Sequence, residues 1–191
     1  CRRAAALPNL CPHFHLSMQS GCDATLKRMN RKYDSARYYE SVTLLREHFD
    51  RPGITTDLIV GFPGETEEEF DQTLDFVRRC AFSAMHIFPY SRRTGTPAAA
   101  LPGQVPKAEK EARARRAAAV AEELRAAWLE RYRADCLTLG RTVRLLRAGE
   151  EEEAFAEAVD DAFALVVRRA DGSREAVSSG EVSVRGLLGY V

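Results

Sequence analysis

The sequence predicts an α/β protein in which parallel β-α units are followed by a long helix and a small all-β domain. Strand-like and amphipathic helical segments alternate between residues 13 and 90. Residues 106–133 are rich in Ala, Arg and Glu, as expected of a helix, and after Gly140 the composition changes to short alternating segments. The predicted divisions are residues 1–105, a connecting helix over 106–138 and a β domain over 139–191.

Composition and charge indicate a globular protein and set limits on its partners. The 191 residues are 45% hydrophobic, and 28 basic residues balance 28 acidic ones, so a polyanion site would have to be a local patch. The sequence contains no apolar run long enough to cross a bilayer and no signal-peptide core, so we expect a cytoplasmic protein without membrane contact. Five widely spread cysteines argue against a disulfide framework.

The first strand is predicted from strict alternation in "HFHLSMQ" (13–19). One face of this strand would carry His13, His15, Ser17 and Gln19, and the other Phe14, Leu16 and Met18. A helix follows behind the cap candidates Asp34 and Ser35, with apolar side chains at helical spacing. The chain lacks an initiator methionine and "CRRAAA" is typical of the end of a helix, so we expect a fragment of a larger protein.

The second and third strands are predicted over residues 54–60 and 84–90, with a helix between them. Thr66 and Glu69 form an S/T-x-x-E capping box at the start of this helix. Its apolar stripe consists of Phe70, Leu74 and Val77. The helices between the three strands predict crossover connections, which join parallel strands and are right-handed. Because a full (β/α)₈ barrel takes about eight strands, we expect the remaining strands upstream of this chain.

The C-terminal part is predicted as one helix and five short strands. The helix has Pro106 near its first turn, where the missing N–H costs nothing. Its expected apolar stripe consists of Val120, Leu124, Trp128 and Tyr132. The five alternating segments after Gly140 suggest a small β-barrel or roll, with "ADGS" (170–173) as a hairpin turn.

The segment "ITTDLIVGFPGETEEEF" (54–70) places a tight turn where parallel α/β proteins bind ligands, at the carboxyl end of a strand. Gly61 and Gly64 allow close backbone approach. Acidic residues in a first helical turn are favoured by the helix dipole alone, and this explains Glu67 and Glu68. Asp57 is different, because a carboxylate inside an apolar strand costs several kcal/mol unless it is paired.

Polar residues on three strands could line one cavity, and these are Gln19, Asp57 and His86. For His86 a hydrogen-bonded core histidine is the simpler interpretation. The segment "CPHFH" offers Cys11, His13 and His15 to a metal, but paired C-x-x-C spacing is absent, so we expect no metal site. The absence of G-x-S-x-G, P-loop and G-x-G-x-x-G motifs argues against a hydrolase or a nucleotide-triphosphate enzyme.

Three blocks resemble the radical S-adenosylmethionine (SAM) methylthiotransferase family in order and spacing. They are "HFHLSMQSGCDATLKRMNRKY", "TTDLIVGFPGETEEEF" and "YSRRTGTPAA". The block "SGCDATLKRMNRKY" resembles most closely the MtaB branch, which modifies tRNA. The MiaB branch has a similar Gln-Ser-Gly strand end and the same Gly-Phe-Pro-Gly-Glu-Thr turn, whereas the RimO branch, which modifies a ribosomal protein, differs after the Gln.

The resemblance implies the C-terminal half of a partial (β/α)₆ radical-SAM barrel. In that family a [4Fe-4S] cluster binds and reduces SAM, and the resulting 5′-deoxyadenosyl radical attacks C2 of an adenosine next to the anticodon. For MtaB this base carries N6-threonylcarbamoyl. A second [4Fe-4S] cluster takes part in sulfur insertion and a second SAM supplies the methyl group. The family's Cys-x₃-Cys-x₂-Cys motif is absent from this sequence, so we expect no catalytic residue and no metal ligand in this chain, and no activity of the chain alone.

The resemblance also assigns site residues. The implied SAM contacts are Ser17, Gln19, Arg31, Asp57, Gly61 and Phe88. Gln19 and Asp57 would contact the ribose or amino-acid end, Arg31 the carboxylate, and Gly61 with the backbone near Phe88 the adenine. The expected contacts to the tRNA anticodon loop are Tyr90, Arg92 and Arg93, and the sulfur and electron donors stay open.

The β domain stands where the family has a TRAM domain, a small barrel thought to grip tRNA. From Gly140 onward seven arginines face ten acidic residues, a balance that does not favour phosphate binding. Two alternatives remain at this stage. One is a methylthiotransferase for a prenylated adenosine or a ribosomal-protein side chain, and the other is a noncatalytic RNA-binding module.

Overall fold

A computed structural model describes residues 1–7, 9–147, 150–177 and 183–186. The chain forms two compact units, Cys1–Arg125 (unit 1) and Ala126–Val191 (unit 2), and the division falls inside the long helix α6 (Lys107–Asp135). Each unit is described by itself. Among the described residues, no helix has both the length and the apolar character that a membrane crossing requires.

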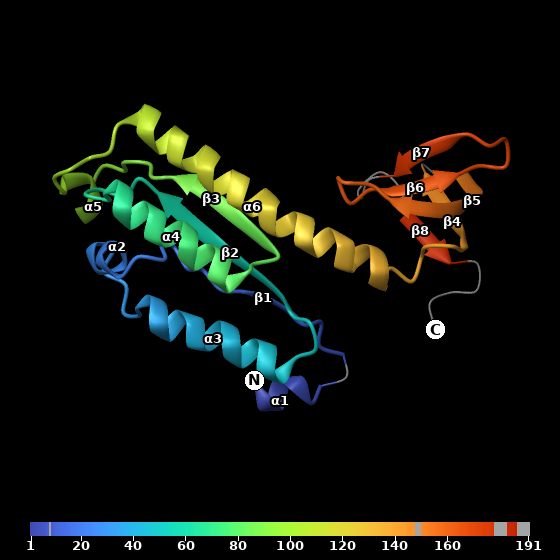
Figure 1. Ribbon diagram of the computed structural model, residues 1–191, viewed down its shortest axis with the longest axis horizontal. Helices are drawn as coiled ribbons and strands as arrows, with labels where there is room; N and C mark the ends of the chain where they lie inside the picture. Colours follow the sequence, from blue (N-terminus) through green and yellow to red (C-terminus); the bar gives the residue numbers. More distant parts are fainter. Residues whose placement is uncertain (8, 148–149, 178–182, 187–191) are drawn as a thin grey trace. The chain divides into compact units, whose positions relative to one another are not determined.

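Unit 1 contains the predicted parallel sheet, and Figure 1 shows its β-α alternation. Its strands lie in the order β1-β2-β3 and are β1 (His13–His15), β2 (Gly53–Val60) and β3 (Ala84–Pro89). The helices of this part are α1 (Arg2–Ala5), α2 (Asp23–Arg28), α3 (Ser35–His48), α4 (Glu67–Cys80), α5 (Pro97–Ala100) and the N-terminal part of α6. The expected parallel β-α units are therefore confirmed.

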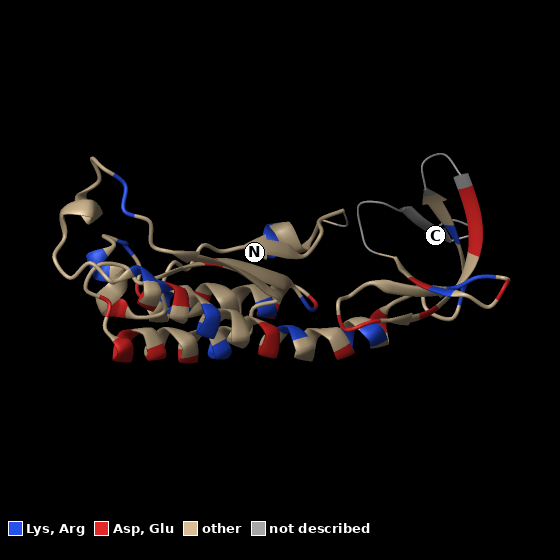
Figure 2. Ribbon diagram, turned by 90° about the horizontal axis from the view of Figure 1, so that it is seen from above, with Lys and Arg blue, Asp and Glu red and all other residues tan. Residues whose placement is uncertain are grey.

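The core of unit 1 lies on one face of this sheet. Alternate residues of β2 are buried, and they are Ile54, Thr56, Leu58 and Val60. Apolar residues of α3, α4 and α6 pack against them in one cluster. Figure 2 shows the long helices on one side of the sheet. The opposite face carries half-buried or exposed residues such as His15, Asp57 and Phe88, which leaves it open in this chain.

The first strand is shorter than predicted because the chain bulges. His15 pairs with Thr55 and Gln19 with Leu58, so the first segment has one more residue than β2 between these pairings. The hydroxyl of Thr56 fills the irregular stretch: it donates to the carbonyl oxygen of Leu16 (2.6 Å) and accepts from the amide of Met18 (2.9 Å). The predicted alternation of faces holds as far as Met18.

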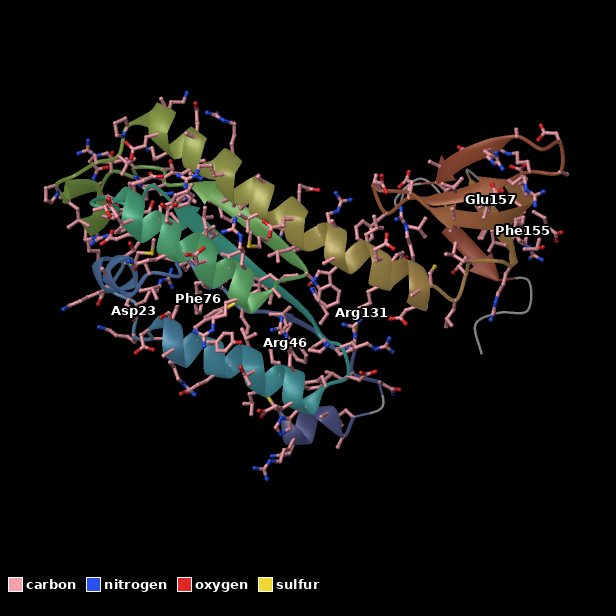
Figure 3. All side chains as sticks on the ribbon, in the orientation of Figure 1. Asp23, Arg46, Phe76, Arg131, Phe155 and Glu157 are labelled. Carbon is pink, nitrogen blue, oxygen red and sulfur yellow. The ribbon has the colours of Figure 1, made fainter. Side chains whose placement is uncertain are left out.

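Both predicted helix starts are confirmed. Asp34 caps α3 by accepting a hydrogen bond from the amide of Arg37 (2.8 Å). Thr66 and Glu69 form the capping box of α4, and the stripe behind it is buried. At the other end of α4, Arg46 of α3, labelled in Figure 3, donates to the carbonyl oxygens of Cys80 (2.6 Å) and Ala81 (3.0 Å).

The predicted stripe of α6 is only partly correct. Val120 is 3% exposed, whereas Tyr132 is 48% exposed and packs its ring on Phe163 of unit 2. Residues spaced strictly by four drift around a helix of 3.6 residues per turn, so a stripe of this spacing leaves the buried face within about three steps.

Unit 2 is an antiparallel sheet in the strand order β7-β6-β5-β4-β8. Its strands are β4 (Thr142–Arg147), β5 (Glu150–Val159), β6 (Leu165–Arg168), β7 (Arg174–Val177) and β8 (Ser183–Gly186). All five predicted strands and the hairpin turn, with Gly172 at φ 83°, are present. Within the described ranges β7 and β8 are not paired, so the expected closed barrel is not found. The ends of the predicted strands beyond Val177 and Gly186 lie outside the described residues.

Candidate functional site

A cleft of about 500 Å³ lies at the carboxyl ends of β2 and β3. It is lined by Gln19, Asp57, Ile59, Phe88, Pro89, Tyr90, Ser91, Arg93, Thr96 and Ala98. Gln19, Asp57 and Phe88 from the predicted SAM set therefore lie in one cavity with Tyr90 and Arg93 from the predicted substrate set. The volume falls in the range of small-molecule sites.

Asp57 is held by its neighbours on the open face. Its Oδ2 accepts a hydrogen bond from the hydroxyl of Ser17 (2.9 Å) and lies 3.2 Å from Nε2 of His15. These two side chains come from the first strand segment, next to β2 in the sheet. The pairing explains how the apolar strand β2 tolerates a carboxylate, as the sequence required.

The pKa of Asp57 is set by opposing effects. Removal of water around the carboxylate is the largest single effect and raises this pKa. Hydrogen bonds from Ser17 and His15, together with the nearby charges of His15 and His86, lower the pKa by more than burial raises it. The net result is a pKa below the ordinary aspartate value, so the carboxylate is charged at neutral pH. A charged carboxylate can accept hydrogen bonds from hydroxyl or ammonium donors.

Aromatic residues form another part of the cleft lining. Phe88 is 51% exposed, so its ring is available on the cleft wall. Tyr90 packs edge-on against Phe62, with ring centres 5.3 Å apart. The Tyr90 hydroxyl oxygen is buried and has no hydrogen-bond partner in the described part of the chain. A flat heterocycle with hydrogen-bonding groups would suit both features.

Gln19 reaches the cleft through an unusual backbone. Its φ of 68° lies in the left-handed region. Its backbone amide donates to the carbonyl oxygen of Asp57 (2.8 Å), and its carbonyl oxygen accepts from the amide of Ile59 (2.9 Å), so both groups bond to β2. Gly21 then passes so close to α4 that a Cβ there would lie 2.7 Å from Cβ of Phe76, which is labelled in Figure 3. Packing against α4 thus requires Gly21, two residues after the cleft residue Gln19.

The Gly-Phe-Pro-Gly-Glu-Thr turn is closed by side chains rather than left open to a ligand. Glu65 accepts from the amide of Gly61 (2.6 Å) and pairs with Arg113 of α6 (2.9 Å). Gly61 has φ 72°, and a Cβ at this position would collide with Lys110. Lys110 in turn donates to the carbonyl oxygen of Tyr90 (2.9 Å). Two side chains of α6 therefore fix the ends of β2 and β3.

Four predicted site residues do not line the cleft, and they are Ser17, Arg31, Gly61 and Arg92. Ser17 contacts Asp57, and Arg92 donates to the carbonyl oxygen of Ala99 (2.9 Å). Arg31 is exposed after α2. Their predicted ligand contacts stay predictions. His86 is exposed next to Phe88 on the open face, so the expected core histidine is wrong.

Sequence reasoning missed the two residues that hold the turn. In the sequence, nothing distinguishes Glu65 from the surface glutamates that follow it, and nothing distinguishes Arg113 from the many other arginines of the same helix. The only available signal was the apolar spacing of α6, because Ala117 and Val120 are buried with Arg113 on the same face.

Comparison with known proteins gives a family match for the first part of the chain. Residues 2–77 match the radical SAM superfamily. The chain is similar to proteins named tRNA-2-methylthio-N(6)-dimethylallyladenosine synthase. The relative from Mycobacterium avium is 45% identical over 147 residues, which cover 77% of this chain and 20% of that protein. The relative from Mycobacteroides abscessus is 50% identical over 120 residues, covering 63% of this chain and 24% of that protein.

These relatives correct the expected branch. Their names specify dimethylallyladenosine, so the expected resemblance to the MtaB branch is not supported. The relatives instead support similarity to the radical SAM methylthiotransferases of the MiaB type. The chain spans about a quarter or less of the length of these relatives.

Unit 2 gives a different comparison. Residues 138–185 match the biotin protein ligase C terminal domain, so a TRAM domain is not supported. A solved biotin protein ligase from Aquifex aeolicus in complex with biotin and ATP is 16% identical, with a TM-score of 0.29 over 44% of this chain and 37% of that one. This score is too low to establish a common fold.

The cleft suits SAM better than it suits an iron–sulfur cluster. A charged carboxylate beside aromatic side chains fits a nucleoside with hydroxyl and ammonium donors. In the described part of the chain, no three His, Cys, Asp or Glu side chains lie close enough to hold a metal ion. The described residues of this chain therefore do not fit a [4Fe-4S] cluster.

Proposed function

We propose that this chain is part of a radical SAM methylthiotransferase that acts on tRNA, and that the cleft at the ends of β2 and β3 holds SAM. The observation that carries the proposal is the meeting of Gln19, Asp57 and Phe88 in one cleft of a chain that matches the radical SAM superfamily. Bound SAM supplies the radical chemistry and the methyl group of such enzymes.

The chain's own residues would bind and orient the nucleoside. The Asp57 carboxylate accepts hydrogen bonds from ribose hydroxyls or the ammonium group, as its lowered pKa favours. Phe88 offers an exposed apolar ring to the base, and the unpartnered Tyr90 hydroxyl offers one hydrogen bond. Gln19, a buried residue of the cleft lining, adds a neutral amide.

The proposed substrate is an N6-prenylated adenosine of tRNA. The names of the similar proteins support this substrate over the N6-threonylcarbamoyl base, and they favour tRNA over a ribosomal protein. Arg93 in the cleft and Arg92 beside it provide positive charge where an anticodon loop would approach. We keep a cytoplasmic location as part of the same proposal.

The test is the nucleoside composition of tRNA. In cells that lack 2-methylthio modification, the full-length protein should restore the 2-methylthio group on prenylated adenosine, measured by mass spectrometry of digested tRNA. Asp57→Asn should lower the product at least about tenfold, since a charged hydrogen bond contributes about 1.5–3 kcal/mol. The control is Asp50→Asn, an exposed aspartate remote from the cleft lining. Product only on threonylcarbamoyladenosine would contradict the substrate, and an unchanged Asp57→Asn product would contradict the site.

A further inference from the structure

His15 stands beside Asp57 but does not line the cleft. Its ring is held at both nitrogens: Nδ1 lies 3.0 Å from the hydroxyl of Thr55, and Nε2 lies 3.1 Å from the hydroxyl of Ser17 and 3.2 Å from Oδ2 of Asp57. A neutral ring that accepts from Thr55 at Nδ1 carries its proton at Nε2. In this tautomer, and equally in the protonated ring, Nε2–H of His15 donates to the carboxylate.

The two donors share one carboxylate oxygen. Ser17 and His15 both reach Oδ2 of Asp57, whereas the described structure gives Oδ1 no hydrogen-bond partner. A carboxylate that is 26% exposed would otherwise rotate among several orientations. Two donors on one oxygen select one orientation, and this leaves the second oxygen available to a ligand.

We propose that His15 and Ser17 are positioning residues that fix the carboxylate of Asp57 and leave its Oδ1 to accept a hydroxyl or ammonium hydrogen of the bound nucleoside. The ligand part of this inference rests on the proposed function. The orientation part depends only on the chain itself and can be tested without SAM.

The first experiment measures the pKa of Asp57 by carbon-detected NMR of its carboxyl group. His15→Phe and Ser17→Ala should each raise this pKa toward the ordinary aspartate value, because each removes a hydrogen bond to the charged form. Ser17→Thr keeps a hydroxyl and should keep the pKa low. His13→Phe is the matched control, since His13 lies on the same strand face but pairs with Gly53, away from Asp57. An unchanged pKa in both His15→Phe and Ser17→Ala would overturn the inference.

The second experiment is a double-mutant cycle on SAM affinity in the full-length protein. His15→Phe should weaken SAM binding about tenfold in the wild-type background and have little effect when Asp57 is already Asn, since coupled residues in contact behave non-additively. A side chain that only stabilises the strand would instead give the same loss in both backgrounds, and this result would overturn the positioning role. A raised Asp57 pKa in a protein that binds no SAM would refute the proposed function and confirm the orientation.

Discussion

Glu65 and Arg113 form an ion pair with side chains only 1% and 3% exposed. Burial raises the pKa of Glu65, and the amide of Gly61 and the charge of Arg113 oppose this shift only in part. When the pKa of a carboxyl is higher in the folded state than in the unfolded state, the folded protein loses stability as the pH rises above the unfolded-state pKa. The pair therefore holds the turn in one shape at the expense of some stability, and neither partner can be removed alone without a larger loss.

Arg113→Met should lower the free energy of unfolding by about 3–5 kcal/mol, because it leaves the Glu65 carboxylate buried without a counter-ion. Arg116→Met is the control on the same helix. Arg116 pairs with Glu67 and Asp71 at the surface, where such pairs contribute at most about 1 kcal/mol. Urea unfolding followed by circular dichroism measures both. Equal losses for the two variants would show that burial of the pair has no special energetic weight.

At the scale of elements, local patterns predicted the caps and faces, and distant contacts decided the rest. The capping box of Thr66 needs only a spacing of three residues, so the sequence alone reveals it. The end of β1 depends on the hydroxyl of Thr56, which bonds to residues about forty positions away in the sequence. Gln19 was correctly placed in the cavity, but the left-handed backbone that brings it there has no local signal.

Gly21→Ala tests the close approach of the first strand segment to α4. The new methyl group would meet Cβ of Phe76 at 2.7 Å, and this atom cannot swing away as the end of a long side chain can. We expect a loss of about 1–3 kcal/mol in the free energy of unfolding, the usual range for overpacking. Gly53→Ala is the control, because its nearest neighbour would be the His13 ring at 3.3 Å, and the Ser83 hydroxyl and the Pro12 carbonyl oxygen lie at ordinary contact distances of 3.7 and 4.0 Å. A loss for Gly21→Ala no greater than for this control would contradict the packing argument.

Across the whole molecule, the basic residues differ in what they face. The described arginines of the β5–β7 sheet region are paired with acids: Arg168 and Arg174 with Glu157, which Figure 3 labels, and Arg169 with Glu152. The acidic start of β5 stands out in red in Figure 2. The loop after β3 instead carries Arg92 and Arg93, both exposed. Composition predicted a charge unfavourable for RNA after Gly140, and this stays a prediction; composition could not show which cations are already neutralised.

The tRNA prediction follows from this difference. Replacing Arg92 and Arg93 together by Ala should raise the tRNA Kd of the full-length protein and reduce its salt slope by about 1.4, since each single-strand phosphate contact contributes about 0.7. Replacing Arg168 and Arg169 by Ala should leave the slope unchanged. Filter binding between 50 and 200 mM salt, the range over which such slopes develop, provides the measurement. The opposite pattern would move the RNA contact to unit 2.

The helix α6 contributes Lys110 to the carbonyl of Tyr90 and Arg113 to Glu65, so its anchors at the two strand ends are spaced by about one helical turn. A single residue inserted between them would swing one anchor through about 100° relative to the other. We therefore expect the rim of the cleft to tolerate new side chains along the outer surface of this helix, but not a residue inserted or deleted between Lys110 and Arg113.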